Sequence, residues 1–135
     1  MIKLFFSAFM MIGIISCNNS TPDVVDKRIP LRTDTINVVK LSDTLVIYES
    51  TCRGCEYEVS TNFAISDSMN IVKLAHVITT DNNSVEMNGG SIRKDLVLVP
   101  VKTGVTNMKL YKFWAKEKTA KDSARFTSFK IEVRQ

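Results

Sequence analysis

Hydrophobic and polar residues alternate along most of the chain in short stretches separated by turn-forming residues. The clearest case is the C-terminal segment, where Phe129, Ile131 and Val133 occupy every second position. Alternation with a period of two predicts a strand with one buried face, whereas an amphipathic helix repeats its apolar residues every three to four positions. No such helical stripe is convincing in this chain. The strand-like segments are 35–41, 44–49, 57–62, 70–80, 85–87, 96–101, 105–114 and 126–133.

Turn signals lie between these segments. Ser42 and Asp43 follow the first of them, Asp81–Asn83 follow the fourth, and Gly104 precedes the seventh. Seven or eight short strands separated in this way predict an all-β sandwich that spans residues 34–135. The polar stretch 115–124 is expected to form a single helical turn or a hairpin loop.

An aromatic cluster lies near the end of the segment 105–114. Strand alternation places Trp114 on the same face as Met108 and Leu110, and it places Tyr111 and Phe113 on the opposite face. Only one face of a sandwich sheet is buried against the other sheet. Some of these aromatic rings are therefore expected to be exposed or covered by a loop.

The first sixteen residues depart from the strand pattern. A positive charge at Lys3 precedes an apolar run, residues 4–15, that only Ser7 and Gly13 interrupt. Twelve helical residues cover about 18 Å, which is too short for a bilayer core of about 30 Å. A charged start followed by a short apolar core predicts a secretory leader, residues 1–16, rather than a transmembrane helix.

The end of this leader reads Ile-Ile-Ser-Cys at positions 14–17. This sequence resembles the lipobox of bacterial lipoproteins, in which the cysteine becomes the new N-terminus and its sulfur carries a diacylglycerol. The resemblance implies lipidation of Cys17, a membrane anchor and a location in the cell envelope. Asn18, in place of Asp, indicates the outer membrane by the same resemblance. Residues 17–33 then form the lipidated cysteine and a flexible tether; an ordinary secreted protein is the alternative.

The charge of the chain argues against nucleic acid as a partner. The formal net charge is +4, and Lys3 is removed with the leader. The remaining basic residues are scattered among acidic ones, whereas a nucleic-acid-binding surface needs a concentrated basic stripe.

Cys52 and Cys55 form a conspicuous Cys-Arg-Gly-Cys motif between two predicted strands. In an exported protein whose Cys17 is acylated, they are an even pair in a compartment that permits disulfides. A disulfide between them stabilises the chain by about 2 kcal/mol, so its main effect is to hold the shape of one loop. Free thiols and a redox centre are the alternatives. The redox interpretation requires the motif at the start of a helix, where the sequence predicts strands instead.

Candidate catalytic and metal-binding residues are scarce. His76 is the single histidine and lies inside a predicted strand. Together with Cys52 and Cys55 it cannot supply the four ligands of a structural zinc site. A nucleophile elbow and a glycine-rich phosphate loop are both missing from the sequence. The sequence therefore predicts a protein without catalytic activity, metal or cofactor.

Three turn regions carry a further pattern: Ser-Thr-Cys-Arg-Gly-Cys-Glu-Tyr at 50–57, Met-Asn-Gly-Gly at 87–90 and Lys-Phe-Trp at 112–114. In order and position they resemble the three loops of chagasin, an immunoglobulin-like inhibitor of papain-type cysteine peptidases. Those loops read Asn-Pro-Thr-Thr-Gly-aromatic, Gly-x-Gly-Gly and Arg-Pro-Trp, and they enter the peptidase cleft together. By this resemblance the peptidase-binding residues are Thr51, Cys52, Arg53, Gly54, Cys55, Asn88, Gly89, Gly90, Phe113 and Trp114.

The resemblance implies an immunoglobulin-like sandwich that inhibits a cysteine peptidase without covalent chemistry. The loop 51–55 would lie over the catalytic Cys–His pair of the peptidase, Gly89 and Gly90 would allow close backbone approach, and Trp114 would anchor one flank. Two other functions remain open. One is an immunoglobulin-like adhesion, assembly or ligand-binding module of the envelope, and the other is a thiol–disulfide redox module that uses Cys52 and Cys55.

Overall fold

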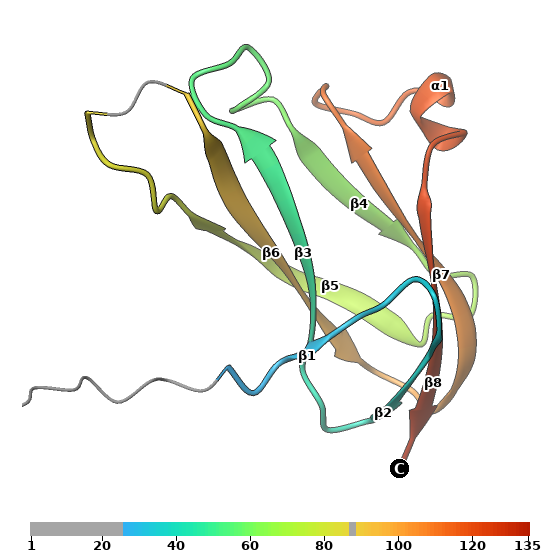
Figure 1. Cartoon of the computed structure of the whole chain (residues 1–135). Helices are drawn as coiled ribbons and strands as arrows, with labels where there is room; N and C mark the ends of the chain where they lie inside the picture. Colours follow the sequence, from blue (N-terminus) through green and yellow to red (C-terminus); the bar gives the residue numbers. More distant parts are fainter. Residues whose placement is uncertain (1–25, 87–88) are drawn as a thin grey trace, which may run out of the picture.

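The computed structural model of the chain describes residues 26–86 and 89–135. These residues form two four-stranded sheets that pack face to face, as Figure 1 shows. One sheet has the strand order β1-β3-β6-β5 and the other the order β2-β8-β7-β4. The elements are β1 (Ile29–Pro30), β2 (Ile36–Lys40), β3 (Leu45–Cys52), β4 (Asn62–Ser66), β5 (Val72–Thr80), β6 (Ser91–Pro100), β7 (Gly104–Phe113), α1 (Ala120–Ser123) and β8 (Thr127–Arg134).

The pairing of the strands confirms the predicted immunoglobulin-like β-sandwich. Strands β3, β5 and β6 pair antiparallel in one sheet, and β4, β7 and β8 do so in the other. The two N-terminal strands differ, because β1 runs parallel to β3 and β2 runs parallel to β8. The chain therefore crosses from one sheet to the other between β1 and β2.

The core lies between the sheets and is built from alternate residues of the long strands. On β8, the alternation seen in the sequence buries Phe129, Ile131 and Val133. The opposite sheet presents fully buried leucines from β3 and β6. The central cluster consists of Val39, Leu45, Ile47, Ile71, Val72, Leu96, Leu98, Met108, Leu110, Phe129, Ile131 and Val133.

Two of the predicted strands are wrong. Residues 57–60 form turns, and β4 begins only at Asn62. The amide and the hydroxyl of Thr61 both donate to the carbonyl of Tyr57, at 3.0 and 2.6 Å, so the backbone curls instead of extending. The segment 85–87 is also not a strand, because residues 85 and 86 form a turn and residue 87 lies outside the described residues.

The folded domain begins before residue 34, where the sequence analysis had placed its boundary. The amide of Ile29 donates to the carbonyl of Thr44 at 2.8 Å, and that of Leu31 donates to Val46 at 2.9 Å. The Arg28 guanidinium is 2.9 Å from the carboxylate of Asp95, whose side chain is 4% exposed. The last part of the predicted tether is therefore attached to the sheet, while residues 17–25 and Cys17 lie outside the described residues.

Replacing Arg28 with methionine is expected to lower the free energy of unfolding by about 2 kcal/mol at pH 7, because buried Asp95 loses a charged partner. A hydrogen bond from Arg93, opposed by burial and reinforced by one from Arg28, holds the pKa of Asp95 below its usual value. A lowered pKa adds stability that is present above the unfolded-state pKa of about 3.9. That stability is lost as the pH falls through the folded-state pKa.

Urea unfolding of the two proteins should therefore differ at pH 7 and converge at a pH well below about 3.9. A difference that stays the same size in acid would show that Arg28 acts through packing and not through its charge.

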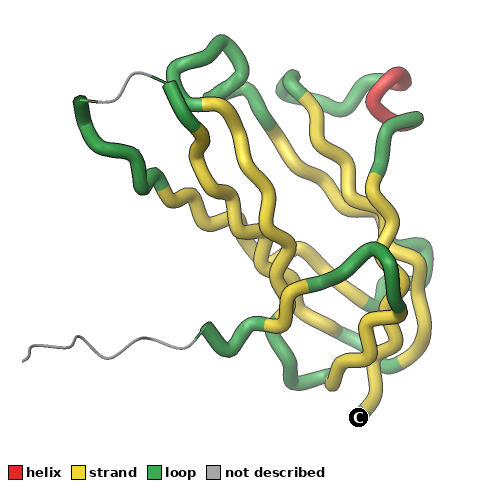
Figure 2. The backbone as a smooth tube through the Cα atoms, in the orientation of Figure 1, coloured by secondary structure: helices red, strands yellow, loops and turns green. Residues whose placement is uncertain are grey.

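The loops divide between the two ends of the sandwich. The loops β3–β4, β5–β6 and β7–β8 lie together at one end, and the chain's C-terminus lies at the other end, as Figure 2 shows. We call the first end the loop end and define it by the described residues 53–61, 81–86, 89–90 and 114–126. It contains most of the residues that the sequence analysis singled out.

Candidate functional site

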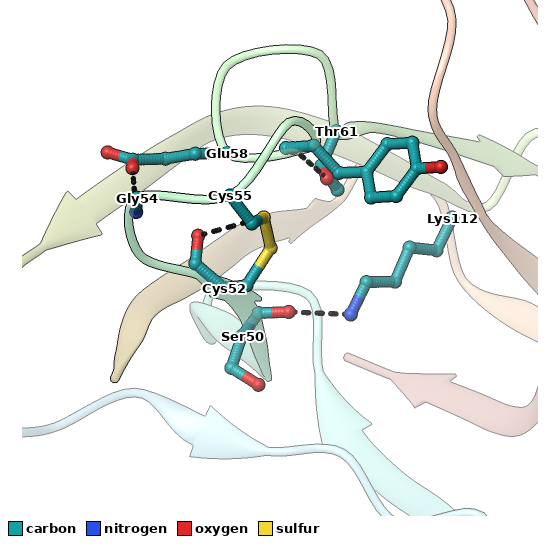
Figure 3. The surroundings of a disulfide bond; sticks show 8 residues. Ser50, Cys52, Gly54, Cys55, Glu58, Thr61 and Lys112 are labelled. Carbon is teal, nitrogen blue, oxygen red and sulfur yellow. Dashed lines mark hydrogen bonds between the residues drawn. A yellow bond between two sulfur atoms is a disulfide. The ribbon is translucent and has the colours of Figure 1, made fainter. Parts of the chain in front are cut away.

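The disulfide lies where the β3–β4 loop begins. Cys52 is the last residue of β3, and it is bonded to Cys55 across a tight turn with a Cα–Cα distance of 5.8 Å (Figure 3). Gly54 lies between them at a φ of 70°, a conformation that side chains with a Cβ rarely adopt. The amide of Gly54 donates to the carboxylate of Glu58, which closes the turn from its other side.

This geometry supports a loop-stiffening disulfide and not a thioredoxin-like redox centre. In a redox centre of that type the first cysteine begins a helix, whose N-terminus stabilises the thiolate. Here Cys52 ends a strand, and turns follow Cys55. The thiolate-stabilising element is therefore missing from the segment that follows the motif.

Arg53 joins the β3–β4 loop to the β5–β6 loop. Its amide donates to the carbonyl of Gly90 at 3.0 Å, and its guanidinium forms an ion pair with Asp81 at 2.8 Å. A further hydrogen bond of 3.1 Å reaches the carbonyl of Ser84. One side chain and one amide thus hold two loops together that are distant in sequence.

Replacing Arg53 with methionine is expected to leave the fold intact and to loosen the β5–β6 loop, because the ion pair and the side-chain hydrogen bond are lost. Amide hydrogen exchange should accelerate about tenfold in residues 81–86 and remain unchanged in β6. Lys94→Met is the matched control, since Lys94 binds Thr79 at 2.9 Å on the neighbouring strand. Equal acceleration in both variants would contradict a specific bridging role for Arg53.

A second set of contacts joins the β3–β4 loop to the β7–β8 loop. The ring of Tyr57 packs against that of Trp114 with a centroid distance of 5.5 Å. Directly after the β3–β4 loop, the side-chain amide of Asn62, the first residue of β4, donates to the carbonyl of Ala115 at 2.7 Å. With the Arg53 contacts, these interactions place the β3–β4 loop between the other two loops and attach it to each of them.

Lys112 connects β7 to the end of β3 where the disulfide loop begins. Its ammonium group lies 2.6 Å from the carbonyl oxygen of Ser50 and 3.2 Å from the carboxylate of Glu49, so it spans from β7 to β3 across the gap between the sheets. Figure 3 shows the contact just beneath the disulfide. The residues of β3 that precede Cys52 are therefore bound to the opposite sheet.

Large apolar side chains are exposed at the loop end. Val59 and Val85 are 94% and 95% exposed, and Tyr57 and Trp114 are about half exposed. Exposed apolar side chains that gather at one place indicate a surface that binds a partner. The sequence analysis did not assign Tyr57, Val59 or Val85 to the binding surface. Val59 lay in a segment interpreted as a strand, and Ser60 was the one turn-forming residue beside it.

Two residues predicted to contact a peptidase are buried. Thr51 is 6% exposed and Phe113 is 5% exposed. Phe113 lies with Tyr111 on the outer face of β7, as the alternation predicted, and the β7–β8 loop covers this face through Phe126, whose ring centroid is 5.9 Å from that of Tyr111. Both side chains are therefore covered in the free protein, and the assignment of Thr51 and Phe113 to the peptidase-binding loops stays a prediction.

The two described glycines of the β5–β6 loop adopt a backbone conformation that favours glycine. Gly89 and Gly90 have φ values of 89° and 99°. A Cβ on Gly90 would lie 2.7 Å from the side-chain oxygen of Asn83, so a larger residue does not fit without movement of that side chain. Asn88, also assigned to this loop, lies outside the described residues.

The described residues contain no group of three or more metal-binding side chains. His76 is exposed on the edge strand β5 and stays a strand residue, as the sequence analysis expected. Within the same described ranges, no helix is long and apolar enough to cross a membrane.

The fold is that of the chagasin-like cysteine peptidase inhibitors. The chain is similar to the crystal structure of the cysteine protease inhibitor EhICP2 from Entamoeba histolytica, with a TM-score of 0.55, 17% identity, and coverage of 78% of this chain and 95% of that one. It is also similar to the solution structure of amebosin, with a TM-score of 0.57, 13% identity, and coverage of 79% and 98%. No protein-family model and no curated protein matches the sequence.

Proposed function

We propose that this protein is a non-covalent inhibitor of papain-type cysteine peptidases that acts through its loop end. One observation carries the proposal: the three loops are tied into a single surface, with Arg53 on one side of the disulfide loop and the Tyr57–Trp114 contact on the other. EhICP2, which shares this fold, is a cysteine protease inhibitor.

The mechanism follows from the shape and the rigidity of this surface. The turn at Gly54 presents backbone without side-chain bulk, so it can approach the bottom of a narrow cleft. The disulfide and the Lys112 contact hold the turn in place before binding, which reduces the entropy cost of association. Trp114 and Val59 then exclude water along the sides of the cleft. The peptidase would be blocked because substrate cannot enter, with no bond formed or broken.

The inhibitor is further proposed to be a lipoprotein of the cell envelope. The Ile-Ile-Ser-Cys sequence at 14–17 supports lipidation at Cys17, and Asn18 supports the outer membrane as its destination. A lipidated cysteine with more than one acyl chain would hold the protein stably at the membrane. The inhibitor would then protect the envelope against secreted cysteine peptidases.

Titration of the chain against papain tests the inhibitory activity. Stoichiometric inhibition is expected, and the double variant Cys52→Ser/Cys55→Ser should bind about tenfold more weakly because its loop is no longer held by the disulfide. Papain is activated with reductant, and the reductant is removed before mixing, because it would otherwise open the disulfide of the unchanged chain. Absence of inhibition at micromolar concentration, against papain and a bacterial papain-like peptidase, would leave an immunoglobulin-like module that binds another partner.

Expression of the full chain in a Gram-negative host tests the anchor. The protein should fractionate with the outer membrane and carry the mass of a diacylglycerol on Cys17. The matched variant Cys17→Ser should lose the lipid and leave the membrane fraction. Equal fractionation of the two proteins, without added lipid mass, would contradict the proposed anchor.

A further inference from the structure

Charged residues are distributed unevenly over the loop end. The β5–β6 loop has two acidic residues and no basic one, and the β3–β4 loop has two acidic residues and one basic residue. The β7–β8 loop has four basic and two acidic residues, so its net charge of +2 faces net charges of −2 and −1 on the other loops. The basic residues of the β7–β8 loop are Lys116, Lys118, Lys121 and Arg125, and its acidic residues are Glu117 and Asp122.

The contacts in the structure leave the basic charges facing outward. The carboxylate of Asp122 accepts hydrogen bonds from the amide and the hydroxyl of Thr119, at 3.0 and 2.6 Å, and so caps α1, while Arg125 and Lys121 attract the same carboxylate through space. Lys116 and Lys121 are both exposed. On the other loops, Arg53 is paired with Asp81, which removes the only basic charge from the acidic side.

Aromatic rings hold two further ammonium groups on the same side of the molecule. The amine of Lys118 lies 3.7 Å from the ring centroid of Tyr111, and that of Lys109 lies 4.3 Å from the ring centroid of Phe126. A ring face attracts a cation without neutralising its charge. The β7–β8 loop and the adjoining part of β7 therefore form a fixed basic flank beside the exposed Trp114.

We propose that this basic flank is the electrostatic contact of the loop end, and that the target peptidase carries an acidic surface beside its cleft where the flank lands. The inference rests on the proposed inhibitory function and adds the chemistry of the partner to it. Opposite charges accelerate association, and like charges at the wrong position slow it. The same acidic surface would repel the β3–β4 and β5–β6 loops. The loop end would therefore enter the cleft with its β7–β8 loop toward the acidic surface, and the reversed orientation would be disfavoured.

Association kinetics of the full chain with two forms of one peptidase test the inference. The probes are papain and succinylated papain, in which lysine ammonium groups are replaced by carboxylates. Lys116→Glu/Lys121→Glu reverses two exposed charges of the basic flank. The matched control is Lys73→Glu/Lys102→Glu, which changes the net charge equally at exposed positions away from the loop end.

With succinylated papain at low salt, the flank variant is expected to associate about tenfold more slowly than the unchanged chain, and the control within about twofold. The variant Glu56→Gln/Glu86→Gln, which neutralises the acidic side, should associate faster. All these differences in association rate should shrink at about 500 mM salt, because charges are then screened within a few ångströms.

Equal slowing of the flank variant and the control would overturn the inference, because net charge alone would then explain the rates. Rates that no variant changes would overturn it as well while leaving inhibition established. Failure of the unchanged chain to inhibit either form of papain would instead reject the proposed function, and this inference with it.

Discussion

Replacement of Trp114 by alanine is expected to weaken inhibition of papain about 30- to 100-fold, which corresponds to 2–3 kcal/mol at about 1.4 kcal/mol per factor of ten. The indole is about half exposed in the free protein, so a partner can cover the remaining surface. It also packs against Tyr57 and thereby positions the neighbouring loop. The loss should appear mainly as faster dissociation, because the indole contributes contact area and no charge.

Tyr48→Ala is the matched control for this variant. Tyr48 is 47% exposed, close to the 49% of Trp114, but it lies in the middle of β3 where Arg93 covers its ring at 4.5 Å. Inhibition should stay within about twofold of the unchanged protein. If Trp114→Ala inhibits as well as the unchanged protein, the third loop is not part of the binding surface.

Truncation of Leu96 to alanine is expected to lower the free energy of unfolding by about 3–4 kcal/mol, the largest effect on stability among these predictions. Leu96 is fully buried at the centre of β6, the strand that pairs with both β3 and β5. Removing its side chain loses apolar burial and leaves a cavity that the two sheets cannot close. Urea unfolding followed by tryptophan fluorescence measures the change.

Leu41→Ala is the corresponding control, because Leu41 is 42% exposed and follows the end of β2. The Leu41→Ala change should lower the free energy of unfolding by less than about 1 kcal/mol. At a temperature where the Leu96 variant stays folded, its inhibition constant should match that of the unchanged protein, since the loop end is built from other residues. A large loss of affinity in the folded variant would show that the core and the loops are coupled.

The fold could be predicted from the sequence because β8 alternates cleanly and turn-forming residues separate most of the other apolar segments. The segments 105–114 and 126–133 correspond to β7 and β8 within a residue or two at each end. The prediction failed at 57–62, where Tyr57 and Val59 alternate like strand residues. There the backbone is fixed by hydrogen bonds from Thr61 that depend on the loop's own geometry.

The candidate site was only partly predictable. Positive φ favours glycine, so the sequence itself indicated turns at Gly54, Gly89 and Gly90. The role of Arg53 could not be predicted, since its contacts with Asp81 and Gly90 depend on how two loops distant in sequence meet in space. The burial of Thr51 and Phe113 depends in the same way on packing between segments that are far apart along the chain.

The attachment of the N-terminal segment to the sheet has a mechanical consequence. If the chain is held at a membrane through residues that precede Asp26, a pull on a bound peptidase reaches the domain first through β1. This strand pairs with β3 over two residues and is further attached by the Arg28–Asp95 ion pair, whereas β2 pairs with β8 over five residues.

Under tension β1 should therefore detach before the rest of the sandwich. Release of residues 26–35 would free a segment with a contour length of about 34 Å, at about 3.4 Å per residue, and so lengthen the connection. The loop end would remain folded during this extension. Detachment of β1 would thus lengthen the connection to the membrane under tension while the peptidase stays bound.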